Sequence, residues 1–348
     1  MPRITTILPT YNRSTFLKRA LDTVRSQTWQ DLKIVVRDNC SMDDTESVVS
    51  TIASDDSRVV YEKQINNIGS HENIRQGIKS VNTEYFSFLC DDDYLEPEFY
   101  SEALNLFDQY PNAGFIAFRV DTVDLDGKII HSNMKNSDGP TKATYYNSKE
   151  GIDAYLRGFL PYTLTGYIFR KDVAHTIDFG EFSEVGYGAD IFFIWHAASR
   201  YNFVVTNSKG GNFTTHSNST SSKLVKVFDE RFLYWWRNRM LIIINDPQVS
   251  NEVKNKISKY YLTHSTKSFH SFKYYMRAAT LLMMDRIKKR QFDELKFDFI
   301  QMRSFVSWPI LVGIKYSVVF LVYLRLDNKS FSLMQLVSKV RSVTCIFR

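Results

Sequence analysis

The chain has 348 residues, of which 44% are hydrophobic and 24% are charged, and this globular composition excludes disordered, collagen-like and low-complexity proteins. Its three cysteines, Cys40, Cys90 and Cys345, have no paired spacing, which excludes a disulfide scaffold and a cysteine-rich zinc module. Residues 226–348 hold 22 Lys and Arg against 9 Asp and Glu, a balance of +13, whereas residues 1–225 have a balance of −7. The basic part is suited to a polyanion, either an anionic membrane surface or a nucleic acid.

Strand-like and helix-like segments alternate over the first 120 residues. Short apolar runs predict strands, and apolar residues at helical spacing predict helices between them. The predicted strands are 4–8, 32–36, 59–61, 85–89 and 113–118, and the predicted helices are 14–27, 43–53, 70–80 and 97–109. Repeated units of this kind predict an α/β fold with a mostly parallel sheet that is covered by helices on both faces.

The pattern is mixed after this point. Asp126-Gly127 predicts a hairpin turn. The following segments are predicted as a helix at 148–158, a strand at 163–169, a helix at 190–199 and strands at 203–206 and 212–215. From about Val227 the chain is helix-like, aromatic and basic. We therefore expect an α/β domain over residues 1–220 and a helical, basic region over residues 221–348.

Three polar clusters follow predicted strands, at the positions where those strands end: Thr10–Arg13, Asp38–Ser41 and Asp91–Asp93. Parallel α/β sheets bind their ligands at the carboxyl ends of the strands, so we expect these clusters to form one site. Three adjacent carboxylates repel one another unless a counter-charge is present, and a hard divalent cation with oxygen ligands supplies one. A solvated acidic turn is the alternative interpretation. The chain has no P-loop and no Gly-x-Gly-x-x-Gly after the first strand, which excludes a standard NTPase or dinucleotide fold.

Four motifs in a fixed order resemble those of the family 2 glycosyltransferases, which have the GT-A fold. They are Leu8-Pro9-Thr10-Tyr11-Asn12-Arg13, Val36-Arg37-Asp38-Asn39-Cys40-Ser41, Asn66-Asn67-Ile68-Gly69 with Asn73 and Gly77, and Phe88-Leu89-Cys90-Asp91-Asp92-Asp93-Tyr94-Leu95. The resemblance is dense over residues 3–120 and thin over 160–220. It implies a Rossmann-like sheet flanked by helices, with a nucleotide-sugar-binding half at 1–120 and an acceptor half at 121–220.

The resemblance also implies an inverting, metal-dependent transfer of a sugar from a nucleotide sugar, most often a UDP-sugar, to an acceptor hydroxyl. It places these residues at the donor: Pro9, Thr10, Tyr11 and Arg13 in the first nucleotide-binding loop, Asp38 at the uracil ring, Asn73 near the ribose and phosphate, and Asp91 and Asp92 in the DxD region. A diphosphate is a poor leaving group until its charge is neutralised, so a bound Mn²⁺ or Mg²⁺ ion fits this chemistry.

The DxD region of this chain departs from the family pattern. When the family's motif is aligned on the residues that follow this region, its first acid falls on Cys90 and its second, metal-binding acid falls on Asp92. The candidate metal ligands are therefore Asp92, Asp93 and His216, and which of the adjacent acids binds the metal is left open. His216 lies where the family has a late histidine that binds the metal or the diphosphate. A loop histidine with a structural hydrogen bond is the alternative.

Inversion requires a base that takes the proton of the acceptor hydroxyl. Asp190 opens an apolar helix and matches the acid that serves as the family's base. An N-cap aspartate, which accepts backbone N–H bonds, is the alternative. Thr165 and Gly166 match the family's acceptor-side loop, where small residues let a substrate approach the backbone, and an ordinary turn is the alternative there.

The basic C-terminal region predicts contact with an anionic membrane surface. Residues 305–324 are mostly apolar but are interrupted by Pro309 and Lys315, which favours a helix that lies on the membrane over one that spans it; a buried helix pair is the alternative. The sequence starts without a secretory signal pattern, so we expect a cytoplasmic protein at the cytoplasmic face of the membrane. A lipid-linked or growing glycan of a bacterial surface polysaccharide is the acceptor implied by analogy.

Two other classes of protein are alternatives. A nucleotidyltransferase combines a similar sheet with a metal and a nucleotide, but it requires a glycine-rich, lysine-bearing loop that Pro9–Arg13 does not provide. A non-enzymatic polyanion-binding protein would use the basic tail, but it leaves the acid triplet unexplained. No nucleic-acid recognition motif is present, so we expect no nucleic-acid partner.

Overall fold

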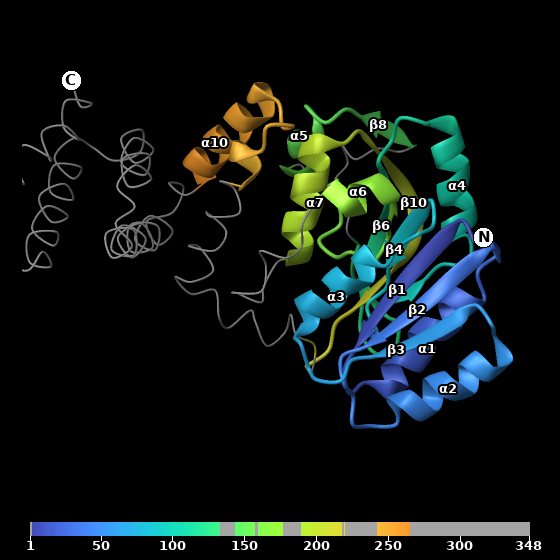
Figure 1. Ribbon diagram of the computed structural model, residues 1–348. Coiled ribbons are helices and arrows are strands. Elements are labelled where there is room, and N and C mark those ends of the chain that lie inside the picture. The colour runs from blue at the N-terminus through green and yellow to red at the C-terminus, as the bar shows by residue number, and fades with distance from the viewer. Residues whose placement is uncertain are drawn as a thin grey trace, which may run out of the picture. The chain divides into compact units, whose positions relative to one another are not determined.

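The computed structural model describes residues 2–132, 143–156, 159–176, 189–217, 219 and 242–264 (Figure 1). The strands are β1 (Ile4–Thr10), β2 (Leu32–Asp38), β3 (Val59–Lys63), β4 (Tyr85–Phe88), β5 (Tyr94–Leu95), β6 (Phe115–Val123), β7 (Ile129–Ser132), β8 (Thr144–Tyr146), β9 (Tyr167–Arg170) and β10 (Phe203–Thr214). The helices are α1 (Ser14–Arg25), α2 (Thr45–Asp55), α3 (Ser70–Lys79), α4 (Phe99–Gln109), α5 (Gly151–Leu156), α6 (Lys171–Thr176), α7 (Ala189–Arg200) and α10 (Asn251–His264).

The strands form one mixed sheet in the order β3-β2-β1-β4-β9-β6-β10-β5. β1 to β4 run parallel, β6 and β10 run parallel to each other, and β9 is antiparallel between β4 and β6. Thr10 lies opposite Asp38, and Ile7 lies opposite Phe88. The carboxyl ends of β1, β2 and β4 therefore meet at one edge of the sheet, and the predicted mostly parallel α/β fold is confirmed.

Each face of the sheet packs against its own set of helices because side chains alternate along a strand. Ile4 and Leu8 of β1 share a core with apolar residues of α1, α2 and α4. Ile7 points to the opposite face, where a Cβ atom added at Gly77 of α3 would lie 2.9 Å from its Cγ2 atom. Figure 1 shows α1 and α2 on one side of β1, β2 and β3, and α3 on the other. The edge of the sheet at which β1, β2 and β4 end is thus supported by packed side chains on both faces.

The structure corrects several predicted elements. The two strands predicted at 203–206 and 212–215 are one strand, β10, whose pairing with β6 shifts register between Thr206 and Gly211. The strand predicted from Thr163 begins only at Tyr167, because the preceding Gly166 has a φ of +87° and turns the chain. β5, β8 and α6 were not predicted, since elements of two to six residues carry little periodicity.

Residues 1–227 and 239–257 form one compact unit, and the rest of the chain forms a second. Within the first unit, His196 Nε2 on α7 lies 2.7 Å from Asp246 Oδ2, and Lys256 Nζ lies 2.8 Å from Asp153 Oδ2. The border at residue 220 remains a prediction. Among the described residues, no helix has the length and apolar character needed to cross a membrane. The segment 305–324 lies outside the described residues.

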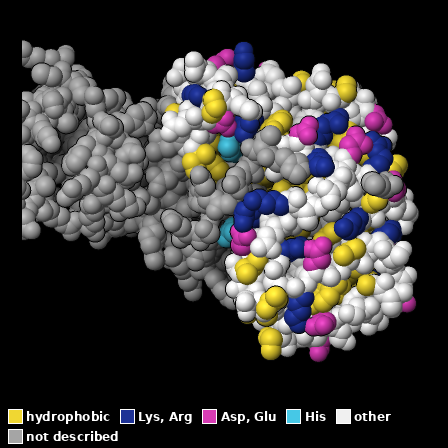
Figure 2. Space-filling model, in the orientation of Figure 1, with side chains coloured by type: hydrophobic (Ala, Val, Ile, Leu, Met, Phe, Trp, Pro, Cys, Tyr) yellow, Lys and Arg dark blue, Asp and Glu magenta, His cyan; other side chains and the backbone are white. Residues whose placement is uncertain are grey.

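Lys and Arg side chains alternate with Asp and Glu over the face of the sheet domain that Figure 2 shows. The surface on this face therefore has a mixed charge. Ion pairs also occur within this domain: Arg25 and Arg58 both contact the Asp56 carboxylate, at 3.0 and 2.7 Å.

Candidate active site

Residues 90–93, which we name the acid loop, follow β4 directly at the carboxyl edge of the sheet. The side chains of Asp91, Asp92 and Asp93 are buried, although three carboxylates stand in sequence. Burial of a charged group is costly unless it is paired and hydrogen-bonded. The partners of each carboxylate therefore indicate how the loop is stabilised.

Thr10, the last residue of β1, and Arg13, which follows the strand, hold the first two acids. Thr10 donates a hydrogen bond from Oγ1 to Asp91 Oδ2 at 2.9 Å. Arg13 Nη1 lies 3.0 Å from Asp91 Oδ1 and 2.9 Å from Asp92 Oδ2, so one guanidinium pairs with two carboxylates. Burial and the charge of Asp92 raise the pKa of Asp91 to about 6, while Arg13 and Thr10 act in the opposite direction. Thr10 and Arg13, both predicted at the donor site, thus lie at the acid loop.

Asp93 is fully buried and accepts hydrogen bonds from two other strand ends. Thr165 Oγ1 donates to Oδ2 at 2.5 Å, and the Thr214 backbone N–H donates to Oδ1 at 2.9 Å. Burial and the neighbouring Asp92 raise the pKa of Asp93 well above its usual range. Thr165, predicted at the acceptor, is itself fully buried and holds Asp93. Its contact with an acceptor remains a prediction.

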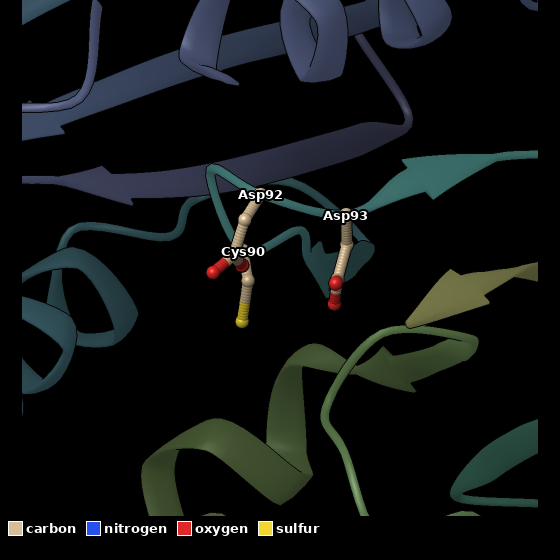
Figure 3. A group of neighbouring side chains, drawn as sticks. All are labelled: Cys90, Asp92 and Asp93. Atoms are coloured by element: carbon tan, nitrogen blue, oxygen red, sulfur yellow. The ribbon is translucent and has the colours of Figure 1, made fainter. Parts of the chain in front are cut away.

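His216 and Cys90 complete this cluster. His216 Nε2 lies 3.2 Å from Asp92 Oδ2, and its ring stacks on Phe16 of α1 with the centroids 4.8 Å apart. One ligand atom each of Cys90, Asp92 and Asp93 lie within 4.8 Å of one another. Figure 3 shows these three side chains leaving the acid loop in the same direction. Oxygen and sulfur donors thus gather at one point, with the His216 imidazole beside one of the Asp92 oxygens, and such donor atoms suit a divalent metal.

The loops after β1 and β2 are fastened to each other. Asn12 accepts a hydrogen bond from the Met42 backbone N–H at 2.7 Å, and its own N–H donates to Ser41 Oγ at 2.8 Å. Asn12 and Cys40 have φ values of +52° and +70°, a left-handed conformation that is uncommon outside glycine. Strained residues of this kind persist where the surrounding structure fixes them, often at functional sites.

Asp38 lies at the end of β2 and is fully buried. Its Oδ1 atom accepts hydrogen bonds from the Ser41 N–H at 2.9 Å and the Ser41 hydroxyl at 2.5 Å, and its Oδ2 atom accepts from Tyr61 at 2.6 Å. Burial and the bond to Asp38 raise the pKa of Tyr61. The predicted uracil-binding acid thus shapes the loop after β2.

The other predicted donor residues differ in their surroundings. Asn73 is buried on α3 and donates its amide to the Arg37 carbonyl at 2.8 Å, so it fixes the end of β2. Tyr11 is 44% exposed, and Pro9 is half-buried in β1 opposite Arg37. The binding of a nucleotide sugar by these three residues remains a prediction.

Asp190 lies in the first turn of α7 and is half-buried. Burial raises the pKa of the Cys90 thiol, and the charges of the acid-loop aspartates and of Asp190 raise it further. Asp190 is therefore close enough to the acid loop for its charge to act on Cys90. Its role as the base remains a prediction.

Arg19 of α1 is a site residue that the sequence did not indicate. Its Nη2 atom donates to the Asp92 carbonyl at 2.6 Å and to Thr214 Oγ1 at 2.9 Å, and its guanidinium lies 4.9 Å from the centre of the Tyr94 ring. Arg19 thus joins the acid loop to the end of β10. In the sequence, only the position of Arg19 beside the apolar stripe of α1 could have indicated its role. The residues to which it donates hydrogen bonds lie more than 70 residues away in the chain.

Comparisons with known proteins are consistent with this geometry. Residues 5–174 match the family described as "Glycosyl transferase family 2". A Campylobacter jejuni protein named "GalNAc(5)-diNAcBac-PP-undecaprenol beta-1,3-glucosyltransferase" is 37% identical over 116 residues, which are 33% of this chain and 36% of that protein. The chain thus matches about a third of that relative's length.

Two solved structures resemble this fold. S. aureus TarS 1-349 in complex with UDP-GlcNAc has a TM-score of 0.61 and is 15% identical, with 96% of this chain and 94% of that chain covered. The mannosyltransferase PcManGT from Pyrobaculum calidifontis, in complex with GDP-Man and Mn²⁺, has a TM-score of 0.50 and is 13% identical, with 92% and 81% covered. At these identities the likeness shows the fold alone.

The four ordered motifs, the mostly parallel sheet and the family match agree with one another. Residues 5–174 thus form a glycosyltransferase family 2 domain, and the described sheet domain has a GT-A-type fold.

Proposed function

We propose that this protein is an inverting, metal-dependent glycosyltransferase that moves a sugar from a UDP-sugar to a hydroxyl of a lipid-linked or growing bacterial surface glycan. The observation that carries the proposal is the buried acid loop, on which groups that end β1, precede β9 and end β10 converge. The relatives support the substrate classes: TarS was solved with UDP-GlcNAc, and the C. jejuni relative is named for an undecaprenol-linked substrate.

The side chains at the acid loop fit a divalent cation. Asp92 and Asp93 offer the hard oxygen ligands that Mg²⁺ and Mn²⁺ prefer, and His216 beside Asp92 offers an imidazole that suits Mn²⁺ better than Mg²⁺. When bound, such an ion neutralises charge on the diphosphate leaving group. The Mn²⁺ complex of PcManGT supports this assignment.

The donor is held by the loops after β1 and β2. Arg13 already pairs with two carboxylates and is placed to contact a phosphate that approaches them. A carboxylate can accept about four hydrogen bonds. Asp38 uses three for Ser41 and Tyr61, so an acceptor direction is left for the N3–H group of a uracil ring.

Asp190 takes the proton of the acceptor hydroxyl as the hydroxyl attacks the anomeric carbon. Its position at the start of α7 and its electrostatic effect on Cys90 support a place beside the acid loop. Attack from the side opposite the leaving diphosphate inverts the anomeric carbon. Thr165 and Gly166 lie on the acceptor side in this proposal, where Thr165 also fixes Asp93.

The basic region after residue 225 holds the enzyme at an anionic membrane surface on the cytoplasmic side. Its balance of +13 supports this part of the proposal, since each basic residue near such a surface contributes about 1 kcal/mol. A lipid-linked acceptor is presented at that surface.

The test is a panel of nucleotide sugars assayed for release of the nucleoside diphosphate, with Mn²⁺, Mg²⁺ or a chelator. We expect a UDP-sugar to react and Asp92→Ala to abolish turnover. Asp190→Asn is expected to remove transfer while UDP binding stays intact. Asp55→Asn, a change of an exposed aspartate on α2, is the matched control and should leave both unchanged.

Two results would contradict the proposal. Full activity of Asp92→Ala would remove the acid loop from the reaction. Release of pyrophosphate from UTP and a sugar phosphate would identify a nucleotidyltransferase instead.

A further inference from the structure

Cys90 occupies a position in the acid loop that the resemblance gives to an acid. Its side chain is half-buried, and its Sγ atom and one carboxylate oxygen each of Asp92 and Asp93 lie within 4.8 Å of one another. In Figure 3 the sulfur points to the same side of the loop as both carboxylates. Within the described part of the chain, no hydrogen bond to this thiol is found, whereas Cys40 donates to the Ile65 carbonyl at 3.5 Å.

The separation of these atoms is close to that of ligands on one ion. Metal–ligand bonds of about 2.0–2.3 Å place neighbouring tetrahedral ligand atoms about 3.3–3.8 Å apart. The three ligand atoms lie within 4.8 Å of one another, so side-chain movements on the order of 1 Å would bring them onto one ion. Asp93 is fixed by Thr165 and Thr214, so the adjustment falls on Cys90 and Asp92.

The charge around Cys90 gives a reason for a sulfur at this place. Asp91, Asp92 and Asp93 follow it directly in the chain, and all three carboxyl groups are buried. A further carboxylate here would add repulsion to the ion-free protein. A neutral thiol adds a potential ligand without adding a negative charge.

We propose that Cys90 supplies a sulfur ligand to the divalent cation held by Asp92 and Asp93, and that it shifts the site's preference from Mg²⁺ toward thiophilic ions such as Co²⁺, Zn²⁺ and Cd²⁺. The inference rests on the metal site of the proposed function. Thiolate selects softer ions, whereas carboxylate and water suit Mg²⁺. The thiol proton leaves to solvent when the sulfur–metal bond forms.

The test is a titration of the full chain with Co²⁺, followed by the thiolate-to-cobalt charge-transfer band in the near ultraviolet. We expect the band in the wild type and in Cys40→Ser, and its loss in Cys90→Ser and Cys90→Ala. Competition between Cd²⁺ and Mg²⁺ measures the preference. Cys90→Ser should reduce the ratio of Cd²⁺ to Mg²⁺ affinity by at least about tenfold. The loss of a residue that only hydrogen-bonds to a metal ligand already lowers metal affinity by about that factor. Cys90→Asp should shift the ratio further toward Mg²⁺.

The variants separate this inference from the proposed function. Co²⁺ binding that Asp92→Asn abolishes, but that shows no thiolate band in the wild type, overturns the role of Cys90 and leaves the metal site standing. A band that persists in Cys90→Ser also overturns it. Absence of any ion binding that depends on Asp92 overturns both the inference and the metal dependence. A cooperative thermal transition of each ligand-free variant near that of the wild type verifies that the fold is retained.

Discussion

Replacement of Thr165 by valine tests whether this residue positions Asp93. Valine keeps the shape of threonine but removes the hydroxyl that donates to Asp93 Oδ2 at 2.5 Å. Since Asp93 is fully buried, no water replaces the lost donor without a rearrangement. The Thr214 N–H then remains as the one hydrogen bond described for this carboxyl group.

The loss can be estimated from the energy of a buried hydrogen bond. A bond to a charged group contributes about 1.5–3 kcal/mol, and a bond to a neutral group about 0.5–1.5 kcal/mol. Burial raises the pKa of Asp93, which favours the lower figures in the metal-free protein. With about 2–4 °C of melting temperature per kcal/mol for a domain of this size, we expect a decrease of about 1–6 °C without metal. The decrease should be larger with Mn²⁺, which favours the charged carboxylate.

Calorimetric melting curves with and without Mn²⁺ measure both quantities. Thr165→Ser is the matched control, because serine keeps the hydroxyl and removes only the methyl group. We expect Thr165→Val to weaken Mn²⁺ binding more than Thr165→Ser does. An unchanged melting temperature and Mn²⁺ affinity, together with a raised KM for the acceptor, would refute the positioning role and favour a direct contact with substrate.

Three further predictions address the site and its frame. Because the pKa of Asp91 is raised to about 6 in the fold, this group binds more protons in the native state than in the unfolded state between pH 4 and 6; its ionisation should cost the metal-free protein about 3 kcal/mol of stability as pH rises through this range. Denaturant unfolding should show the stability of the wild type falling by this amount relative to that of Asp91→Asn, and equal slopes would contradict the assignment. Gly166→Ala places a Cβ atom 2.3 Å from Val120 Cγ2 at a φ of +87°. We therefore expect it to destabilise the fold by at least about 2 kcal/mol in thermal melts. A smaller loss of stability would show that the turn relaxes. Asp56→Asn weakens the paired contact with Arg58 and should destabilise the fold by about 1–3 kcal/mol at pH 7, with a much smaller effect below pH 2; a constant difference across pH would rule out an ionic origin.

The first half of the fold was predictable from sequence because its signals are local. The apolar stripe of α1 and the short apolar runs of β1 and β2 lie within windows of a few residues. The candidate site could be predicted only as far as its acids. Asp91–Asp93 stand together in sequence, whereas the group that neutralises two of them, Arg13, lies 78 residues before.

The order of the strands in the sheet explains which groups contact the acid loop. β5 follows the loop and pairs with β10, with Leu95 opposite Gly211, and this pairing brings the Thr214 N–H to Asp93. The antiparallel β9 lies beside β4, so the turn before β9 delivers Thr165 to the same carboxyl group. Neither pairing has a local signal, because β5 has only two residues and the strand predicted at 163–169 does not indicate which strands lie beside β9. The sequence thus indicates which charges must be neutralised, and the sheet topology determines which groups do so. This division explains why ordered motifs identified the family while the contacts of Thr165, Arg19 and Cys90 required the structure.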